Sequence, residues 1–311
     1  MKGRVLVTGA SGFIGQDLVR RLTAAGWQVR AASRKPMVTS TSAETVGLPE
    51  LADDADWRPL VAGVSHVVHL AGIAHATRTI PDSTYHAVNA RAVGSLAAAA
   101  VAAGVTRVVM MSSIRAQCGA SSVGVVDEGR AAEPIDAYGR SKLEGERLLG
   151  EGLASSLTSW CVLRPVLVYG PGVKGNMAAL ARMARTPWPL PIGGLTAQRS
   201  LLGLANLAGA VDHALLAPNA ADATFLLADP GPMTVPEIVG AMRQGLGRHR
   251  GIFGLPMTPL RLAANAVGRQ SVWERIAGDL VVSTARLEAS GWRPLETAGE
   301  GIARWMREVR G

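Results

Sequence analysis

The sequence contains few cysteines, few aromatic residues and no long hydrophobic run. Its two cysteines, Cys118 and Cys161, form neither a CxxC pair nor any other metal-ligand spacing, and the six histidines add none. We therefore predict no metal site. The longest apolar runs, such as residues 96–105, fall short of the roughly 20 residues that a membrane-spanning helix needs. The first residues lack a secretory layout, so we expect a cytoplasmic protein without membrane partners.

Acidic residues are also under-represented, which leaves a formal charge of +8 and an isoelectric point near 10.3. The arginines are scattered singly, and aromatic residues, on which nucleic-acid bases stack, make up only 4% of the chain. Nucleic acid is therefore not a predicted partner. The basic excess suits small phosphorylated ligands equally well.

The first half of the chain alternates short apolar runs with longer helical patterns. Continuous apolar strands separated by helices are typical of a parallel sheet covered on both faces. Strands are expected at residues 5–7, 29–32, 67–70 and 107–111, and helices at residues 15–25, 85–103 and 138–149. The predicted fold class is therefore α/β, a doubly wound parallel sheet of the Rossmann type.

Proline and glycine cluster after residue 165, with helical segments between them. This change predicts a dinucleotide-binding domain over residues 1–165 and a smaller, loop-rich substrate-binding region over residues 166–311. Because no linker separates the two parts, we expect the second to be interleaved with the last strands of the sheet.

Three glycines follow the first predicted strand and open the first helix, at Gly9, Gly12 and Gly15. In this position the first permits a tight turn, the second lets the backbone approach a pyrophosphate, and the third lets helix and strand pack closely. The helix N-terminus then offers free N–H groups to phosphate. The pattern predicts a dinucleotide site.

The end of the second strand is where such sites choose their cofactor. An acidic residue there would bind the ribose hydroxyls of NAD, but this chain has Ser33 and Arg34. Arg34 can hold a 2′-phosphate, so NADP(H) is favoured, with NAD(H) as the alternative.

Tyr138 and Lys142 lie four residues apart at the start of a helical segment, and therefore share one face. A neighbouring ammonium stabilises a phenolate, so Tyr138 can exchange a proton at neutral pH. Ser112 and Ser113 end the strand at residues 107–111, where open α/β sheets bind ligands.

In their order, these elements resemble the extended short-chain dehydrogenase/reductase family, also described as the NAD-dependent epimerase/dehydratase family, over nearly the whole chain. Ser113, Tyr138 and Lys142 match its catalytic triad. The chain departs from the family at Glu50, where Asp is usual. The resemblance implies cofactor contacts from Gly9, Ser11, Gly12, Phe13, Ile14, Gly15, Ser33, Arg34, Leu51, Leu70, Ala71, Gly72, Asn89, Ser112, Tyr138, Lys142 and Pro165.

The runs at residues 163–176, 198–207 and 291–294 are similar to the bacterial nucleotide-sugar epimerase and 4-ketoreductase branch. That likeness implies a nucleotide-sugar substrate, with a UDP-sugar favoured, and a homodimer formed through two helices, one being residues 138–149. Residues 114–118 depart from the branch, which predicts an altered sugar preference. The implied substrate-binding residues are His75, Ser113, Gln117, Asn176, Arg199 and Arg275.

Four functions remain open at this point. A 4-ketoreductase that consumes NADPH ranks slightly ahead of a C4 epimerase, because Arg34 favours NADPH. A reductase of small carbonyl compounds would use the same triad without Asn176 or Arg199. A non-catalytic NADP-binding sensor is the fourth, and the intact Tyr138–Lys142 pair argues against it.

Overall fold

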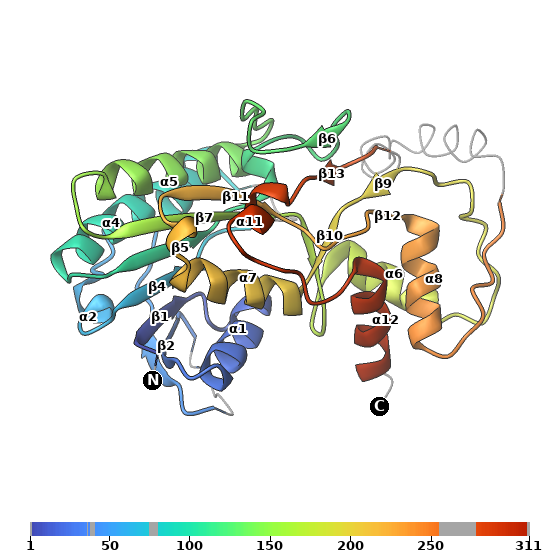
Figure 1. Cartoon of the computed structure of the whole chain (residues 1–311), viewed down its shortest axis with the longest axis horizontal. Coiled ribbons are helices and arrows are strands. Elements are labelled where there is room, and N and C mark those ends of the chain that lie inside the picture. Colours follow the sequence, from blue (N-terminus) through green and yellow to red (C-terminus); the bar gives the residue numbers. More distant parts are fainter. Residues whose placement is uncertain (1, 36, 38–40, 75–79, 255–277, 310–311) are drawn as a thin grey trace.

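The computed structural model describes residues 2–35, 37, 41–74, 80–254 and 278–309. Seven parallel strands form its central sheet in the order β11-β7-β5-β4-β1-β2-β3 (Figure 1). Their bounds are β1 (Arg4–Thr8), β2 (Gln28–Ser33), β3 (Glu44–Gly47), β4 (His66–His69), β5 (Arg107–Met111), β7 (Ser159–Pro165) and β11 (Ala223–Leu227). The strand order runs outward in both directions from β1, which confirms the predicted doubly wound sheet.

Helices cover both faces of this sheet (Figure 1). Val5 and Val7 of β1 belong to one hydrophobic core, and Leu6 belongs to the other, because successive strand residues point to opposite faces. The first core contains α1 (Phe13–Ala24), α7 (Leu204–Leu216) and α11 (Ala285–Ala289). The second contains α2 (Arg58–Val61), α4 (Ala92–Ala102) and α5 (Ala137–Leu153).

The helix predicted over residues 85–103 is present within a continuous helical segment over residues 82–102, but a π-helical turn interrupts its α-helical pitch. The structure has α3 (Asp82–His86), a π-helical turn labelled η1 (Ala87–Arg91), and then α4. The wide π turn carries Asn89, whose amide oxygen accepts from the Ile73 N–H at 2.9 Å and whose Nδ2 donates to the Ile73 carbonyl at 3.0 Å. Apolar periodicity does not report this local change in pitch, which is often found at functional sites.

A smaller helical layer stands beside the sheet (Figure 1). It consists of α6 (Gly175–Ala184), α8 (Val235–Gly245) and α12 (Ala298–Glu308), which share a third hydrophobic core. Strand pairs connect it to the rest: β8 (Leu167–Tyr169) with β10 (Leu201–Gly203), β9 (Gln198–Arg199) with β12 (Met233–Thr234), and β6 (Val125–Val126) with β13 (Val281–Val282). Two short 3-10 turns, η2 (Ile114–Ala116) and η3 (Pro218–Ala220), complete the described elements.

The chain returns to the large sheet after entering this layer, since α7 packs on α1 and β11 pairs with β7. The domain boundary at residue 165 therefore stays a prediction. None of the described helices is both long and apolar enough to span a membrane.

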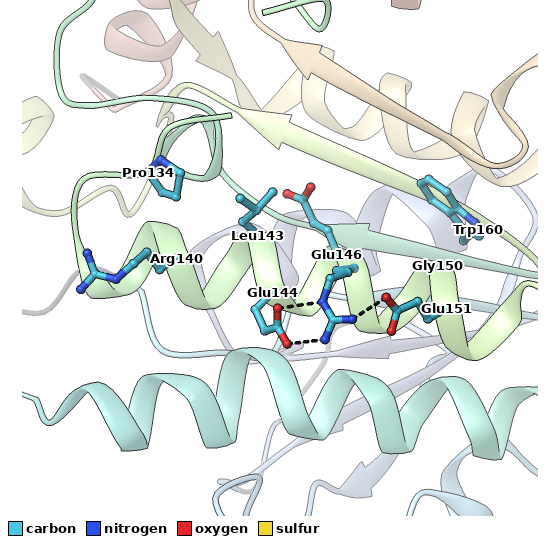
Figure 2. A pocket seen from close by; sticks show the side chains of 9 residues that line it. Pro134, Arg140, Leu143, Glu144, Glu146, Gly150, Glu151 and Trp160 are labelled. Atoms are coloured by element: carbon cyan, nitrogen blue, oxygen red, sulfur yellow. Dashed lines mark hydrogen bonds and ion pairs between the residues drawn. The ribbon is translucent and has the colours of Figure 1, made fainter. Parts of the chain in front are cut away.

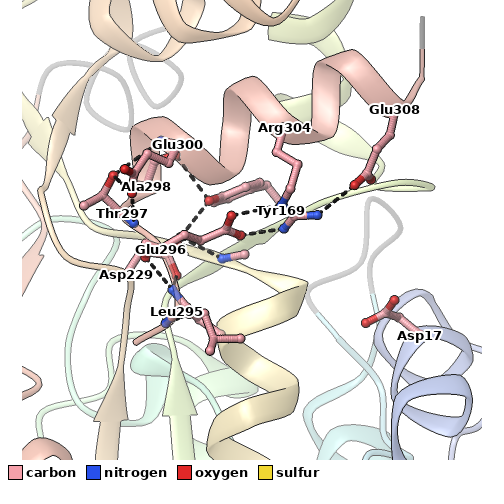
Figure 3. A network of polar contacts seen from close by, with 12 residues as sticks. Asp17, Tyr169, Asp229, Leu295, Glu296, Thr297, Ala298, Glu300, Arg304 and Glu308 are labelled. Carbon is pink, nitrogen blue, oxygen red and sulfur yellow. Dashed lines mark hydrogen bonds and ion pairs between the residues drawn. The ribbon is translucent and has the colours of Figure 1, made fainter. Parts of the chain in front are cut away.

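A buried polar cluster connects the helical layer to the sheet (Figure 3). Asp229, which follows β11, accepts hydrogen bonds from the Tyr169 hydroxyl at 2.7 Å and from Asn206 at 2.8 Å. The Tyr169 hydroxyl also lies 3.3 Å from the Ala298 carbonyl at the start of α12. Burial raises the pKa of Asp229 to about 6. The cluster fixes α12 against the end of the sheet.

Candidate active site

The predicted site residues gather at the carboxyl edge of the sheet. Strand order reverses between β1 and β4, and β5 lies on the far side of β4. Gly9, Ala71 and Ser112 directly follow or closely follow the ends of these three strands. Ligands of open α/β sheets bind in the crevice at such a switch point.

Gly9 and Gly15 of the turn after β1 are required by close packing or by backbone conformation, and Gly12 is tightly packed. Gly9 has φ +68, and a Cβ there would come within 2.9 Å of the Ala71 nitrogen. A Cβ on Gly15 would lie 2.3 Å from the Gly9 carbonyl oxygen. A Cβ on Gly12 would lie 3.1 Å from that same oxygen. A side chain is therefore excluded at Gly9 and at Gly15, where backbone packs directly against backbone.

Helix α1 begins at this turn without a side-chain cap. Gln16 is the first residue whose amide donates into the helix start, to the Gly12 carbonyl at 3.0 Å. The preceding amides of Phe13, Ile14 and Gly15 therefore point out of the helix N-terminus, as donors for an anion. Ser11 is exposed beside them. Together with the glycine turn, these donors fit the pyrophosphate of a dinucleotide.

The end of β2 carries an exposed ion pair. The Arg34 guanidinium lies 3.4 Å from the Glu50 carboxylate, and both side chains are more than half exposed. The Ser33 hydroxyl is turned back to the Lys35 carbonyl at 2.5 Å. Leu51 is buried, with its amide donating to Glu50 at 3.1 Å. An acid and a base thus both stand where the cofactor ribose is expected.

Beyond β4, Leu70, Ala71 and Gly72 lead from the sheet toward the predicted catalytic helix. The Ala71 amide donates to the Thr8 hydroxyl at 3.1 Å. A Cβ on Gly72 would lie 2.7 Å from the Asn89 amide oxygen and 3.2 Å from the Lys142 Nζ. The bare backbone at Gly72 therefore brings Asn89 and Lys142 against the strand end.

His69 is a buried neutral residue below this strand end. Its Nδ1 lies 3.0 Å from the Thr8 hydroxyl, and its Nε2 has no hydrogen-bond partner among the described residues. Burial lowers the pKa of His69 to about 3, with a further contribution from the nearby Lys142. His69 is therefore uncharged at neutral pH and does not oppose the ammonium of Lys142.

Ser113 and Tyr138 are hydrogen-bonded to each other, and Lys142 lies one helical turn beyond Tyr138 on α5. Tyr138 is half-buried near the start of α5, which is capped by the Asp136 carboxylate accepting from the Gly139 amide at 2.7 Å. Burial raises the pKa of Tyr138, and its hydrogen bond with Ser113 lowers it. The buried Lys142 donates from Nζ to the Met111 carbonyl at 3.2 Å. Burial lowers the pKa of Lys142 to about 8, while Glu146 opposes the shift.

The predicted substrate-binding residues are placed less uniformly. Asn176 is exposed in the first turn of α6. The Arg199 guanidinium donates to the Ala120 carbonyl at 3.0 Å and to the Gly278 carbonyl at 2.7 Å. Gln117 is buried and donates to the Arg130 carbonyl at 2.6 Å, so protein groups already occupy its amide. His75 and Arg275 lie outside the described residues.

Sequence reasoning missed a buried ion pair directly behind the triad, between Glu146 and Arg164. It also missed why α5 contains glycines: a Cβ on Gly139 would lie 2.2 Å from the Arg115 carbonyl oxygen, and one on Gly145 would lie 2.2 Å from that of Asn89. Two helical glycines flanking Lys142 were the available signal of a close backbone approach. Pro165, an expected cofactor contact, is buried at the end of β7.

Comparisons with known proteins identify the family and agree with the fold. The model of the NAD dependent epimerase/dehydratase family matches residues 5–228. UDP-glucose 4-epimerase of Vibrio cholerae is 29% identical over 310 residues, covering 97% of this chain and 94% of that protein. The 2'-dehydrokanamycin reductase of Streptomyces kanamyceticus is 31% identical over 276 residues, covering 86% of this chain and 71% of that protein. The solved structure of MoeE5 in complex with UDP-glucose and NAD superposes with a TM-score of 0.76 at 26% identity, over 99% of each chain.

Substitution of Gly15 by Ala tests the glycine turn. The added methyl group would meet the Gly9 carbonyl oxygen, so we expect dinucleotide affinity to fall at least tenfold, about 1.4 kcal/mol. Isothermal titration with NAD and NADP measures the loss. Gly94→Ala in α4 is the matched control, because its methyl group meets only the side-chain carbons of Leu148, at 3.7 and 3.8 Å. Equal affinity of both variants would contradict the close packing described here.

His69 predicts an acid-sensitive fold. The folded-state pKa of about 3 lies below the ordinary value of 6.5, so the unfolded chain binds one more proton between these values. Stability from His69 is present above pH 6.5 and is lost as the pH falls, by about 1.4 kcal/mol per pH unit. We expect His69→Gln to flatten the pH dependence of urea unfolding by about this slope. His249→Gln, at an exposed position, should leave the slope unchanged.

Proposed function

Because the chain belongs to the NAD dependent epimerase/dehydratase family and is an enzyme of the extended short-chain dehydrogenase/reductase type, we propose that it is a nucleotide-sugar C4 epimerase. The observation that carries the proposal is the Ser113–Tyr138–Lys142 arrangement beside a dinucleotide cradle, in a chain that aligns almost end to end with a UDP-glucose 4-epimerase. The slight preference for a 4-ketoreductase rested on Arg34 alone. Glu50 weakens that argument, because it pairs with Arg34.

In the proposed reaction, Tyr138 exchanges a proton with the sugar 4-hydroxyl. Ser113 hydrogen-bonds Tyr138 and orients the reacting oxygen. Burial keeps Tyr138 protonated in the free enzyme, so forming the phenolate requires a positive charge close by, which we propose that Lys142, one helical turn further along α5, supplies. A bound nicotinamide supplies the acceptor and donor of hydride. The keto-sugar must then rotate so that the opposite face of its C4 keto group is presented to the nicotinamide. Tyr138 returns the proton to the sugar oxygen when hydride is returned to that face.

For the cofactor, we propose NAD(H) in preference to the NADP(H) expected from Arg34. The Glu50 carboxylate neutralises Arg34, repels a 2′-phosphate and offers an acceptor to ribose hydroxyls. Glu50, from the segment after β3, would in this role replace the acidic residue with which dinucleotide sites recognise NAD. It also suits an epimerase, which undergoes no net oxidation.

For the substrate, we propose a UDP-sugar, with Asn176 and Arg199 near the nucleotide. The Arg199 guanidinium donates to the Ala120 and Gly278 carbonyls, so a nucleotide contact by Arg199 rests on the family resemblance and not on these internal contacts. A substrate contact by Gln117 has no support from its contacts, which are all internal. The altered sugar preference predicted from residues 114–118 stays part of this proposal.

We also propose that the chain forms a homodimer through α4 and α5. These helices lie side by side, and the face of α5 carries a groove of 640 Å³ lined by Arg140, Leu143, Arg147 and Trp160 among others (Figure 2). An apolar floor edged by charged side chains is suited to a second subunit.

The function is tested by following nucleotide-sugars by proton NMR. With catalytic NAD, UDP-glucose and UDP-N-acetylglucosamine are the first substrates to compare. Interconversion of 4-epimers without net consumption of cofactor would support the proposal. Stoichiometric oxidation of NADPH by a keto-sugar would instead identify a reductase, the second candidate that the Streptomyces kanamyceticus relative and Arg34 favour.

Tyr138→Phe removes the proposed acid/base and retains the ring. We expect turnover to fall at least a thousandfold, within the range of general acid–base catalysis, while cofactor affinity changes less than about twofold. Tyr85→Phe is the matched control, because Tyr85 presents its ring 6.2 Å from that of Tyr138. Turnover of Tyr138→Phe within a few-fold of the parent would remove Tyr138 from the reaction.

Glu50→Gln tests the cofactor proposal. Loss of the carboxylate frees Arg34, so we expect the affinity ratio of NADP to NAD to rise about two- to fivefold, the scale of one exposed charge pair. Fluorescence titration with both cofactors gives the ratio. Asp53→Asn, a nearby exposed acid, serves as the control. An unchanged ratio would show that Glu50 does not read the ribose.

A further inference from the structure

Three consecutive residues at the end of β5 are tied to three successive turns of α5. Ser113 hydrogen-bonds Tyr138, and the Met111 carbonyl accepts from Lys142. Between them, the Ser112 hydroxyl donates to the Glu146 carboxylate. Because positions 138, 142 and 146 are four apart, all three lie on one helix face. Two of the ties involve proposed catalytic residues, and the third involves Glu146.

The Glu146 carboxylate is buried and fully engaged. Its side chain accepts from the Arg164 Nε at 3.0 and 3.1 Å and from Nη2 at 2.5 Å, in addition to Ser112. Arg164 comes from β7, the strand next to β5, and both partners are 8% exposed. Figure 2 shows Glu146 directed toward the sheet, whereas Glu144 and Glu151 both pair with Arg147 on the other side of the helix.

The same ion pair reaches the loop that follows the triad serine. The Arg164 Nη1 donates to the Gln117 amide oxygen, and the Gln117 amide nitrogen holds the Arg130 carbonyl at 2.6 Å. One buried carboxylate therefore connects α5, β7 and both sides of the turn that carries Ser113. Movement of Glu146 would displace the serine relative to Tyr138.

Glu146 also sets the charge environment of Lys142. The groups that face the Lys142 ammonium are the neutral His69 from β4, the Met111 carbonyl from β5, the Asn89 amide from η1 and Glu146 from its own helix. Of these four groups from the described residues, only Glu146 carries a negative charge. It favours the ammonium form, which the proposed reaction requires.

We propose that Glu146 is a positioning residue that, held by Arg164, fixes Ser112–Ser113 against α5 and places a negative charge one helical turn from Lys142. Its kinetic consequence rests on the proposed function, but its effect on Lys142 does not. Simple stability is a poor explanation for such a pair. Desolvation of two charges offsets their attraction, and apolar replacements of buried ion pairs are often as stable.

Titration of Lys142 tests the electrostatic part without any substrate. The chain has only four lysines, Lys2, Lys35, Lys142 and Lys174, so ¹³Cε-lysine NMR resolves each midpoint, with Lys142→Met for assignment. In Glu146→Gln, loss of the carboxylate leaves Arg164 uncompensated, so the Lys142 midpoint should fall by about one pH unit. Glu151→Gln, on the exposed side of α5, should leave it in place. An unchanged midpoint in folded Glu146→Gln would overturn the electrostatic role.

The double variant Glu146→Met with Arg164→Met separates positioning from stability. We expect its melting temperature to lie near that of the parent, with turnover still reduced at least tenfold and the alkaline limb of the kcat profile moved to lower pH. Recovery of turnover together with stability would show that the pair only supports the fold. If the parent enzyme turns over no nucleotide-sugar, the proposed function fails, and the lysine titration still decides the role of Glu146 in either variant.

Discussion

The attachment of α5 to the end of β5 is the constraint on which the candidate active site depends. Tyr138 and Lys142 share a helix, so their separation is set by helical geometry, but their position above the cofactor cradle is set by contacts to Met111, Ser112 and Ser113. The glycines at 139 and 145 allow the helix to come this close, since a side chain at either would collide with a backbone carbonyl. Close packing and buried polar ties thus act together.

The dinucleotide cradle, which is the glycine turn after β1 with the start of α1, also depends on close backbone packing. Gly9, Gly12 and Gly15 bring backbone against backbone, and the uncapped start of α1 leaves its first amides free for phosphate. Gly72 joins the two halves, because its bare Cα lies against Asn89 and Lys142. The site is therefore assembled from strand ends and helix starts, elements whose positions are fixed by the two hydrophobic cores.

Much of this arrangement could be predicted from the sequence, and the part that could not has physical reasons. The apolar strands and the glycine spacing each reflect a local requirement, so the doubly wound sheet could be predicted from them, whereas the roles of Ser113, Tyr138 and Lys142 stay predictions. The π turn at Asn89 could not be predicted, because a change of helical pitch leaves apolar spacing nearly intact. Glu146 and Arg164 were invisible because a charged residue on an amphipathic helix or in a strand gives no sign of a partner distant in the chain. Gln117 was predicted to bind substrate because the sequence does not show that Arg164 donates to its amide oxygen.

The account is tested most directly by a crystal structure of the chain with NAD and UDP-glucose bound. It predicts that the pyrophosphate lies on the amides of residues 13–15 and that the Tyr138 hydroxyl lies within hydrogen-bond distance of the sugar 4-hydroxyl, beside the nicotinamide. A bound dinucleotide whose nicotinamide lies away from Tyr138, or a pyrophosphate held elsewhere, would contradict it.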